Sequence, residues 1–293
     1  MSKIPKRTAD YLGPLTNTNR WNDFKLRSDD IIITTPSKCG TTWSQNIAAM
    51  MVFGKVNFEG RLTDISPWVE SVTSPMEKVH KTLNAQVHRR ILKSHTPMDG
   101  IPYTPDVTYI AVYRHPLDIH FSMRNHSRNK VHSPLDHLFP ADPRKGVLMF
   151  INDAPPTRNC DHLTLETVVG HYKSLKQWAH LPNIHLFHYA DMKADLRKTM
   201  KRFAYILGYD FIPATMEKLI KGASFESMRK KSYKFTPHAG MGVFKDDESF
   251  FDSASSNKWE KYMTEADIEL YHRRVSNMLE ETDRIWLESG SCE

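Results

Sequence analysis

The stretch Ile31–Trp43 constrains the fold more than any other part of the sequence. It begins with a β-branched run, passes through a turn containing Pro, Ser and Gly, and ends in a helical pattern. A strand, a tight turn and a helix together present backbone N–H groups and the positive end of a helix to an anion. Gly40 allows a ligand to approach the backbone closely. Thr41 and Thr42 add hydroxyl donors and Lys38 adds a positive charge, so the stretch predicts a phosphate-binding loop.

This loop differs from the Walker pattern, GxxxxGK[ST], in which the lysine follows the glycine. Here Lys38 precedes Gly40. The alternative to an anion-binding loop is an ordinary strand-to-helix turn with a solvated lysine.

Composition narrows the class of protein. The chain has 293 residues, a mass of 34.0 kDa and 40% hydrophobic residues, which suits a single domain over 1–293 with a polar arm at 1–29. Its net charge of +6 suits an anionic ligand, whereas no basic run or motif indicates nucleic acid. The three cysteines are too widely spaced for a disulfide framework, and the longest apolar run, 47–53, is far too short to span a membrane. No signal peptide is visible, so we expect a cytoplasmic protein.

Strands alternate with helices along the chain, which predicts an α/β fold with a mostly parallel central sheet flanked by helices, similar to P-loop nucleotide-binding folds. Segments punctuated by proline or lacking periodicity are expected to be loop-like. We expect Asp191 to cap a helix that ends before Gly208, and Thr264 to open a final helix. The predicted strands are 31–35, 89–95, 108–113 and 184–189; the predicted helices begin near 42, 116 (ending near 125), 165 and 213; the loop-like segments are 127–163 and 229–257.

Four polar residues, Lys38, His95, Arg114 and Tyr189, each follow a different predicted strand. Ligands of open α/β sheets bind outside the carboxyl ends of the strands, so these side chains are expected to converge at one edge. Arg114 suits a phosphate because its guanidinium group is planar and bidentate, and Ser122 follows on the same helix.

His95 is the candidate general base, since the free pKa of histidine lies near neutrality. The alternative is a structural histidine held at the end of a strand. His126, His171 and His188 receive no role at this point. No HExxH motif or Cys/His cluster indicates a metal site.

Several segments, taken together and in order, resemble the cytosolic-type sulfotransferases. These enzymes move a sulfonate group from 3′-phosphoadenosine 5′-phosphosulfate (PAPS) to a hydroxyl or amine. The segment 38–43 resembles the family's 5′-phosphosulfate loop, 93–97 its Lys-x-His-x-Pro segment, 114–122 its 3′-phosphate segment, 189–192 its Tyr-Glu-Asp-Met segment, and 224–225 an element near the adenine.

The resemblance implies a role for each of these residues. PAPS would be the co-substrate, and a small-molecule hydroxyl or amine would attack its sulfur in line, without a metal. His95 would accept the acceptor's proton, Lys38 would neutralise charge on the leaving phosphate, and Lys93 would belong to the catalytic group. The co-substrate would be bound by Lys38, Cys39, Gly40, Thr41, Thr42, Trp43, Arg114, Ser122, Tyr189 and Phe225, with Trp43 and Phe225 flanking the adenine.

The chain departs from the family at Asp252, Ser253 and Ala254, which replace an Arg-Lys-Gly sequence that grips the 3′-phosphate. Losing each strong charge-assisted contact is expected to weaken anion binding by about 1–3 kcal/mol. Lys234, Lys245 and Lys258 are candidates for compensating it. Two alternatives therefore stand beside a sulfotransferase: a catalytically weak nucleotide-binding relative, and an ATP-dependent phosphotransferase that would require magnesium. The residues after Trp259 keep little of the family's dimerisation motif, so no dimer is inferred.

Overall fold

A four-stranded parallel sheet forms the centre of the protein. The structure is a computed structural model that describes residues 3–251 and 253–291. The strand order is β2-β1-β3-β4, and every neighbouring pair is parallel. The predicted strands and their direction are confirmed. The strands are β1 (Ile31–Thr34), β2 (Ile91–Ser94), β3 (Thr108–Tyr113) and β4 (Ile184–His188).

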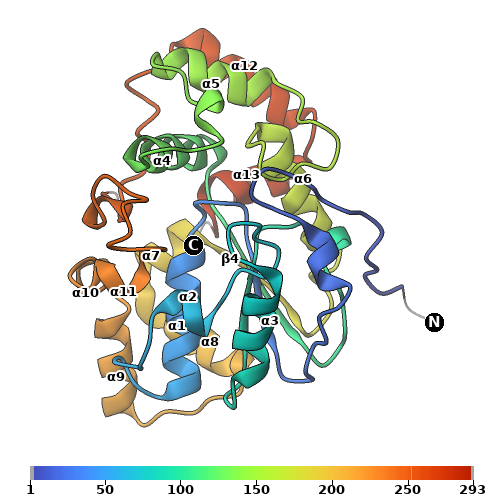
Figure 1. Cartoon of the computed structure of the whole chain (residues 1–293). Coiled ribbons are helices and arrows are strands. Elements are labelled where there is room, and N and C mark those ends of the chain that lie inside the picture. The colour runs from blue at the N-terminus through green and yellow to red at the C-terminus, as the bar shows by residue number, and fades with distance from the viewer. Residues whose placement is uncertain (1–2, 252, 292–293) are drawn as a thin grey trace.

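Helices surround this sheet and follow most of its strands along the chain. The α-helices are α1 (Thr41–Phe53), α2 (Leu62–Ile65), α3 (Met76–Ala85), α4 (Pro116–Asn129), α5 (Pro143–Asn152), α6 (Leu165–Lys176), α7 (Tyr189–Ala194), α8 (Leu196–Leu207), α9 (Pro213–Gly222), α10 (Phe225–Arg229), α11 (Ser232–Phe235), α12 (Glu265–Ser276) and α13 (Glu281–Ser289). Short 3-10 helices are η1 (Thr18–Trp21), η2 (Met98–Gly100), η3 (Asp136–Leu138) and η4 (Glu248–Phe250). In Figure 1, α4, α5 and α12 gather at the top of the molecule. Among residues 3–251 and 253–291, no helix combines the length and the hydropathy needed to cross a bilayer.

The sheet is buried on both faces, as expected for parallel strands covered by helices. Alternate strand residues enter two separate clusters, since neighbouring side chains of a strand point to opposite faces. Ile32 and Tyr109 belong to the cluster that includes residues of α6 and α13, whereas Ile31 and Ile110 belong to the cluster that includes residues of α1 and α8. β1 and β3 are buried along their whole length, whereas His185 and Leu186 in the middle of edge strand β4 are partly exposed.

The N-terminal segment is held against the rest of the fold. Trp21 and Phe24 are buried. Asp161 accepts hydrogen bonds from the backbone N–H groups of Leu15 (2.8 Å) and Thr16 (2.9 Å) and from the Thr16 hydroxyl (2.7 Å). These contacts tie the arm to the segment that precedes α6.

The prediction that 127–163 is loop-like was wrong. Within it, α5 begins at Pro143, the first helical position, where the missing N–H costs nothing. Asp142 caps this helix by accepting from Arg144 N at 2.9 Å, and Phe150 and Val147 are buried. Proline thus begins a helix here where the sequence pattern suggested a loop.

Two predictions about helices in the C-terminal half of the chain were also wrong: the residue that caps α8 and the identity of the final helix. Asp195, rather than Asp191, caps α8, accepting from Lys198 N at 2.7 Å. Asp191 lies within α7 and accepts instead from Ser291 N at 3.0 Å. The capping box at Thr264 is confirmed, but the helix it opens is followed by α13 and is not the final one.

A buried ion pair fixes the ends of the strands opposite the predicted site. Arg90 donates to both carboxylate oxygens of Asp30, at 2.7 and 2.5 Å, and both side chains are almost fully buried. We expect Asp30→Ala to lower the free energy of unfolding by about 3–5 kcal/mol, because it leaves a buried guanidinium group without its counter-charge. Urea denaturation measures this loss.

The matched control is Glu217→Ala, which removes the partner of Arg197 in an exposed ion pair. It should barely move the urea midpoint. Equal losses for the two variants would show that the Asp30–Arg90 pair does not stabilise the fold.

Candidate functional site

The loop between β1 and α1 has the backbone of an anion site. Gly40 is the N-cap of α1 with a φ of 106°, and Lys38 also lies in the left-handed region with a φ of 68°. No side chain caps this end of α1, so its first N–H groups face the loop. The hydroxyls of Thr35 and Thr41 are hydrogen bonded to each other. The predicted phosphate-binding loop is therefore formed as a strand, a turn and a helix N-terminus.

The parallel pairing brings the predicted residues to one edge of the sheet. Tyr189 packs against three of them, Arg114, Trp43 and Gly40. The Arg114 guanidinium carbon lies 4.6 Å from the centre of its ring, and the Trp43 ring lies 5.6 Å away, edge to face. A Cβ atom added to Gly40 would approach Tyr189 Cδ2 to 3.2 Å. Tyr189 thus packs against the loop, α1 and Arg114 at once.

His95 is held in one orientation at the end of β2. Its Nδ1 lies 2.8 Å from the carbonyl oxygen of Thr35, so Nδ1 carries the proton and donates it. Its ring meets Trp68 edge to face, with centroids 4.8 Å apart. Burial, and then the Lys93 cation, lower the pKa of His95 well below its usual value. The imidazole is therefore neutral at physiological pH, with Nε2 as its acceptor atom.

Lys93 lies beside the same tryptophan, its Nζ 4.8 Å from the Trp68 ring centre. Burial, followed by the charge of Lys130, lowers the pKa of Lys93 to about 8, while Glu70 acts in the opposite direction. Lys93 and His95 are consequently neighbours, and the Lys93 cation helps to keep the His95 imidazole neutral.

Arg114 is buried where β3 meets α4. It donates to the carbonyl oxygen of Ser255 at 3.0 Å, and its Nη2 lies 3.7 Å from an Asp118 oxygen. Its Nε is buried and has no hydrogen-bond partner in the part of the chain that the structure describes. Ser122 is buried one helical turn beyond Asp118. An arginine with a spare N–H beside a buried hydroxyl fits a phosphate group.

The segment where the sequence departs from the family lies over this arginine. Asn257 N donates to Asp118 at 2.7 Å. Burial raises the pKa of Asp118, while Arg114 and, less strongly, Lys258 act to lower it. Of the three lysines expected to compensate, Lys258 is thus the one near Arg114. Lys234 donates to the Phe58 carbonyl, and Lys245 donates to Arg128 O at 2.8 Å. Asp252 lies outside the described residues.

The remaining predicted residues line the border of α1. Trp43 Nε1 donates to the carbonyl of Ala223 at 2.8 Å, and Phe225 begins α10, its ring 6.3 Å from that of Phe251. Cys39 is fully buried, and burial raises the pKa of its thiol. Thr42 is partly exposed in the first turn of α1. Their contacts with a nucleotide stay predictions.

Two histidines without a predicted role are structural. His171 lies between Thr34 Oγ1 (3.3 Å) and the Tyr113 hydroxyl (3.0 Å). His188 accepts from Ala190 N and donates to Leu287 O at 3.1 Å. His126, by contrast, has a buried Nδ1 without a partner among the described residues, and with Lys130 and Phe250 it lies near Lys38. Its four-residue spacing from Ser122 was the signal that could have found it.

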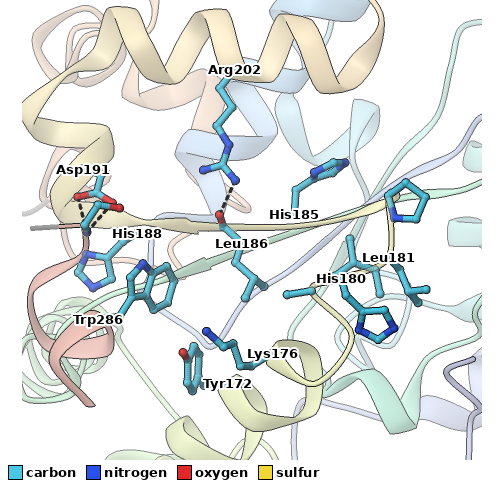
Figure 2. A pocket seen from close by; sticks show the side chains of 14 residues that line it. Tyr172, Lys176, His180, Leu181, His185, Leu186, His188, Asp191, Arg202 and Trp286 are labelled. Atoms are coloured by element: carbon cyan, nitrogen blue, oxygen red, sulfur yellow. Dashed lines mark hydrogen bonds between the residues drawn. The ribbon is translucent and has the colours of Figure 1, made fainter. Parts of the chain in front are cut away.

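No group of three or more His, Cys, Asp or Glu in the described ranges could hold a metal ion. A separate groove runs along the edge strand β4, where Arg202 donates to Leu186 O at 2.9 Å (Figure 2). The groove is bordered by Tyr172, His185 and Trp286 and contains none of the predicted site residues. We therefore place the site at the ends of β1 to β4 and not in this groove.

Comparison with known proteins matches the chain to the sulfotransferase domain over residues 28–283. The glycolipid sulfotransferase Rv1373 of Mycobacterium tuberculosis is 32% identical, with 96% of this chain and 94% of that protein covered. The amine sulfotransferase of Oryctolagus cuniculus is 23% identical, with 86% and 81% covered. Among solved structures, mouse sulfotransferase SULT7A1 complexed with PAP superposes with a TM-score of 0.72 at 19% identity, covering 91% of this chain and 89% of that one.

Buried neutral imidazoles make the fold sensitive to acid. Burial lowers the pKa values of His95 and His126 well below normal and that of His171 to about 3. As the pH falls through about 6.5 the unfolded chain binds protons that the folded chain does not, so stability is lost on acidification. For an imidazole like His171 we expect a loss of about 2 kcal/mol of unfolding free energy between pH 7 and pH 5.

Urea denaturation at pH 5, 6, 7 and 8 measures this slope. His171→Gln should remove one imidazole's share of it, whereas the exposed His180→Gln should leave it unchanged. A free energy of unfolding that is constant over this range would contradict the expected lowering of the pKa values.

Proposed function

The chain belongs to the sulfotransferase domain family of PAPS-dependent enzymes, and from this premise we propose that it transfers the sulfonate group of PAPS to a hydroxyl group of a small acceptor by in-line displacement. The observation that carries the proposal is the convergence of Lys38, Lys93, His95 and Arg114 at one edge of the sheet. The ATP-dependent alternative loses its support, because the matched family transfers sulfonate.

His95 acts as the general base in this mechanism. Because Nδ1 donates to Thr35 O, the lone pair of Nε2 is available to accept the proton of the acceptor hydroxyl. The acceptor oxygen then forms a bond to sulfur as the bond from sulfur to the phosphate oxygen breaks. The low pKa of His95 keeps the imidazole neutral until the proton arrives, and the anionic group being transferred stabilises the imidazolium that results.

Lys38 and Lys93 supply the charge that the displacement requires. Lys38, on the loop before α1, neutralises the negative charge that develops on the leaving oxygen. Lys93, beside His95, holds the transferring sulfonate. The N–H groups of the first turn of α1 and the hydroxyls of Thr41 and Thr42 hold the 5′-phosphate.

Arg114 and Ser122 bind the 3′-phosphate, with the free Nε of Arg114 as a donor. The guanidinium group exchanges its contact with the Ser255 carbonyl for phosphate oxygens, which form stronger charge-assisted hydrogen bonds. Trp43 and Phe225 flank the adenine. Since the relative from Mycobacterium tuberculosis is a glycolipid sulfotransferase, sugar hydroxyls are included among the proposed acceptors.

Calorimetric titration tests the donor site with adenosine 3′,5′-bisphosphate (PAP) beside adenosine 5′-monophosphate. We expect PAP to bind at least about tenfold more tightly, because Arg114 adds a charge-assisted contact to the 3′-phosphate. Arg114→Gln should abolish this preference, whereas Lys245→Gln, on the neighbouring surface, should retain it. Equal binding of the two nucleotides by the unaltered protein would favour the weak nucleotide-binding relative.

The base assignment is tested by release of PAP from PAPS over a panel of phenols, alcohols and glycosides. With the best acceptor of the panel, we expect His95→Ala to lower single-turnover rates by about 10²–10⁴-fold. The control is His180→Ala, which removes an exposed histidine. If His95→Ala kept the unaltered rate, His95 would not be the base.

A further inference from the structure

One face of α4 runs through the whole site. Asp118, Ser122, His126 and Lys130 follow one another at four-residue intervals, the spacing that places side chains on the same side of a helix. Asp118 and Ser122 lie at the Arg114 end, where they belong to the proposed 3′-phosphate site. His126 and Lys130 lie at the other end, past the residues that the donor requires.

Aromatic rings hold this second end in place. The His126 ring lies 5.3 Å from that of Phe244 and 5.6 Å from that of Phe250. Lys130 is the C-cap residue that follows α4, and it forms a β-bridge with Phe244. Lys38 Nζ lies 5.2 Å from the centre of the Phe250 ring. His126 and Lys130 are therefore fixed next to the reacting region rather than extended into solvent.

Several lysine charges act on His126 and on one another at this end of α4. His126 is subject to the charges of Lys38, Lys130 and Lys93, which together with burial lower its pKa. The acidic neighbours are Glu70, which acts on Lys93, and Asp136, which acts on Lys130. Burial raises the pKa of Glu70, which weakens it as a counter-charge. Such a cluster of like charges is stabilised when an anion enters it.

Two buried nitrogen atoms in this region also have no partner among the described residues. They are the Nδ1 atom of His126 and the indole Nε1 of Trp68, the ring that contacts both Lys93 and His95. Leaving buried N–H groups unpaired is unfavourable, and a ligand that accepts from them gains binding energy. Lys38, Lys93 and Arg114 already serve the sulfonate and phosphates of the donor.

We propose that His126, Lys130 and Trp68 form an acceptor subsite for an anionic substituent, so that the enzyme prefers alcohols that carry a carboxylate or a similar anion near the reacting hydroxyl. This inference rests on the proposed function, because it places the acceptor beside His95. Lys130 pairs with the anion, the indole N–H of Trp68 donates to it, and His126 donates to it from Nδ1 as the Nδ1–H tautomer. The substituent is thereby directed away from the donor's sulfonate while the hydroxyl faces His95.

Binding of matched compounds to the PAP-loaded protein tests the subsite by calorimetry. One pair is octyl glucoside and octyl glucuronide, used below their micelle concentrations; the other is 4-methylbenzyl alcohol and 4-(hydroxymethyl)benzoate. We expect the anion of at least one pair to bind about tenfold more tightly than its neutral partner. Lys130→Met should remove this preference and Lys130→Arg should retain it. The control, Lys145→Met, removes an exposed lysine of α5 and should keep the preference.

Equal binding within both pairs, or no binding of any of the four compounds, overturns the subsite. A preference that survives Lys130→Met overturns it as well. The donor proposal fails separately, since PAP binding is measured before any acceptor is added. An anion preference in a protein that does not bind PAP would uphold the subsite and reject the donor.

Discussion

Parallel pairing of β1 with β2 on one side and β3 on the other is the constraint on which the site depends. The register sets Ile33 beside Lys93 and Thr34 beside Ser94. Because all four strands run in one direction, the chain leaves each of them at the same edge. A reversal of any one strand would move its following residue to the edge where Asp30 and Arg90 form their ion pair. Residues far apart in the sequence lie close together because the hydrogen bonds between the strands fix the positions of the strand ends.

The same convergence lowers the stability of the folded protein. It brings cations together, keeps imidazoles neutral by burial, and leaves Lys38 in a left-handed conformation that costs on the order of 1–3 kcal/mol. The stability that tolerates these features comes from the two apolar clusters on either face of the sheet. An anionic donor offsets part of the cost by balancing charge. This explains why residues that reduce the stability of the free protein lie at the predicted binding surface.

The strands were predictable from the sequence because each is a short run of β-branched or aromatic residues. Such a run favours a buried strand over a helix or a loop. The loop before α1 was predictable because Gly40 and the threonines specify both backbone and chemistry. Helix α5 was missed because the prolines in and around it read as breaks, although Pro143 starts a helix. His126 and Lys130 were missed for a related reason. The predicted helix ended near Asn125, whereas α4 continues to Asn129 and carries the four-residue pattern further. The aromatic support from Phe244 and Phe250 comes from a distant segment that local patterns do not connect to α4.

The placement of Arg114 supports the proposal of a 3′-phosphate site that lacks the family's Arg-Lys-Gly sequence. Among the described residues, Arg114 contacts the backbone of Ser255, and Lys258 acts on Asp118 from the same segment. The segment thus faces Arg114 with the Ser255 carbonyl and the nearby Lys258, rather than with an arginine and a lysine that bind the phosphate. A carbonyl is a weaker partner for a guanidinium group than a phosphate is, so the exchange favours the nucleotide. Asp118 opposes that exchange, because its carboxylate already attracts Arg114. The affinity of the proposed 3′-phosphate site therefore depends on the balance between the buried Arg114 and the carboxylate of Asp118, four residues further along the chain.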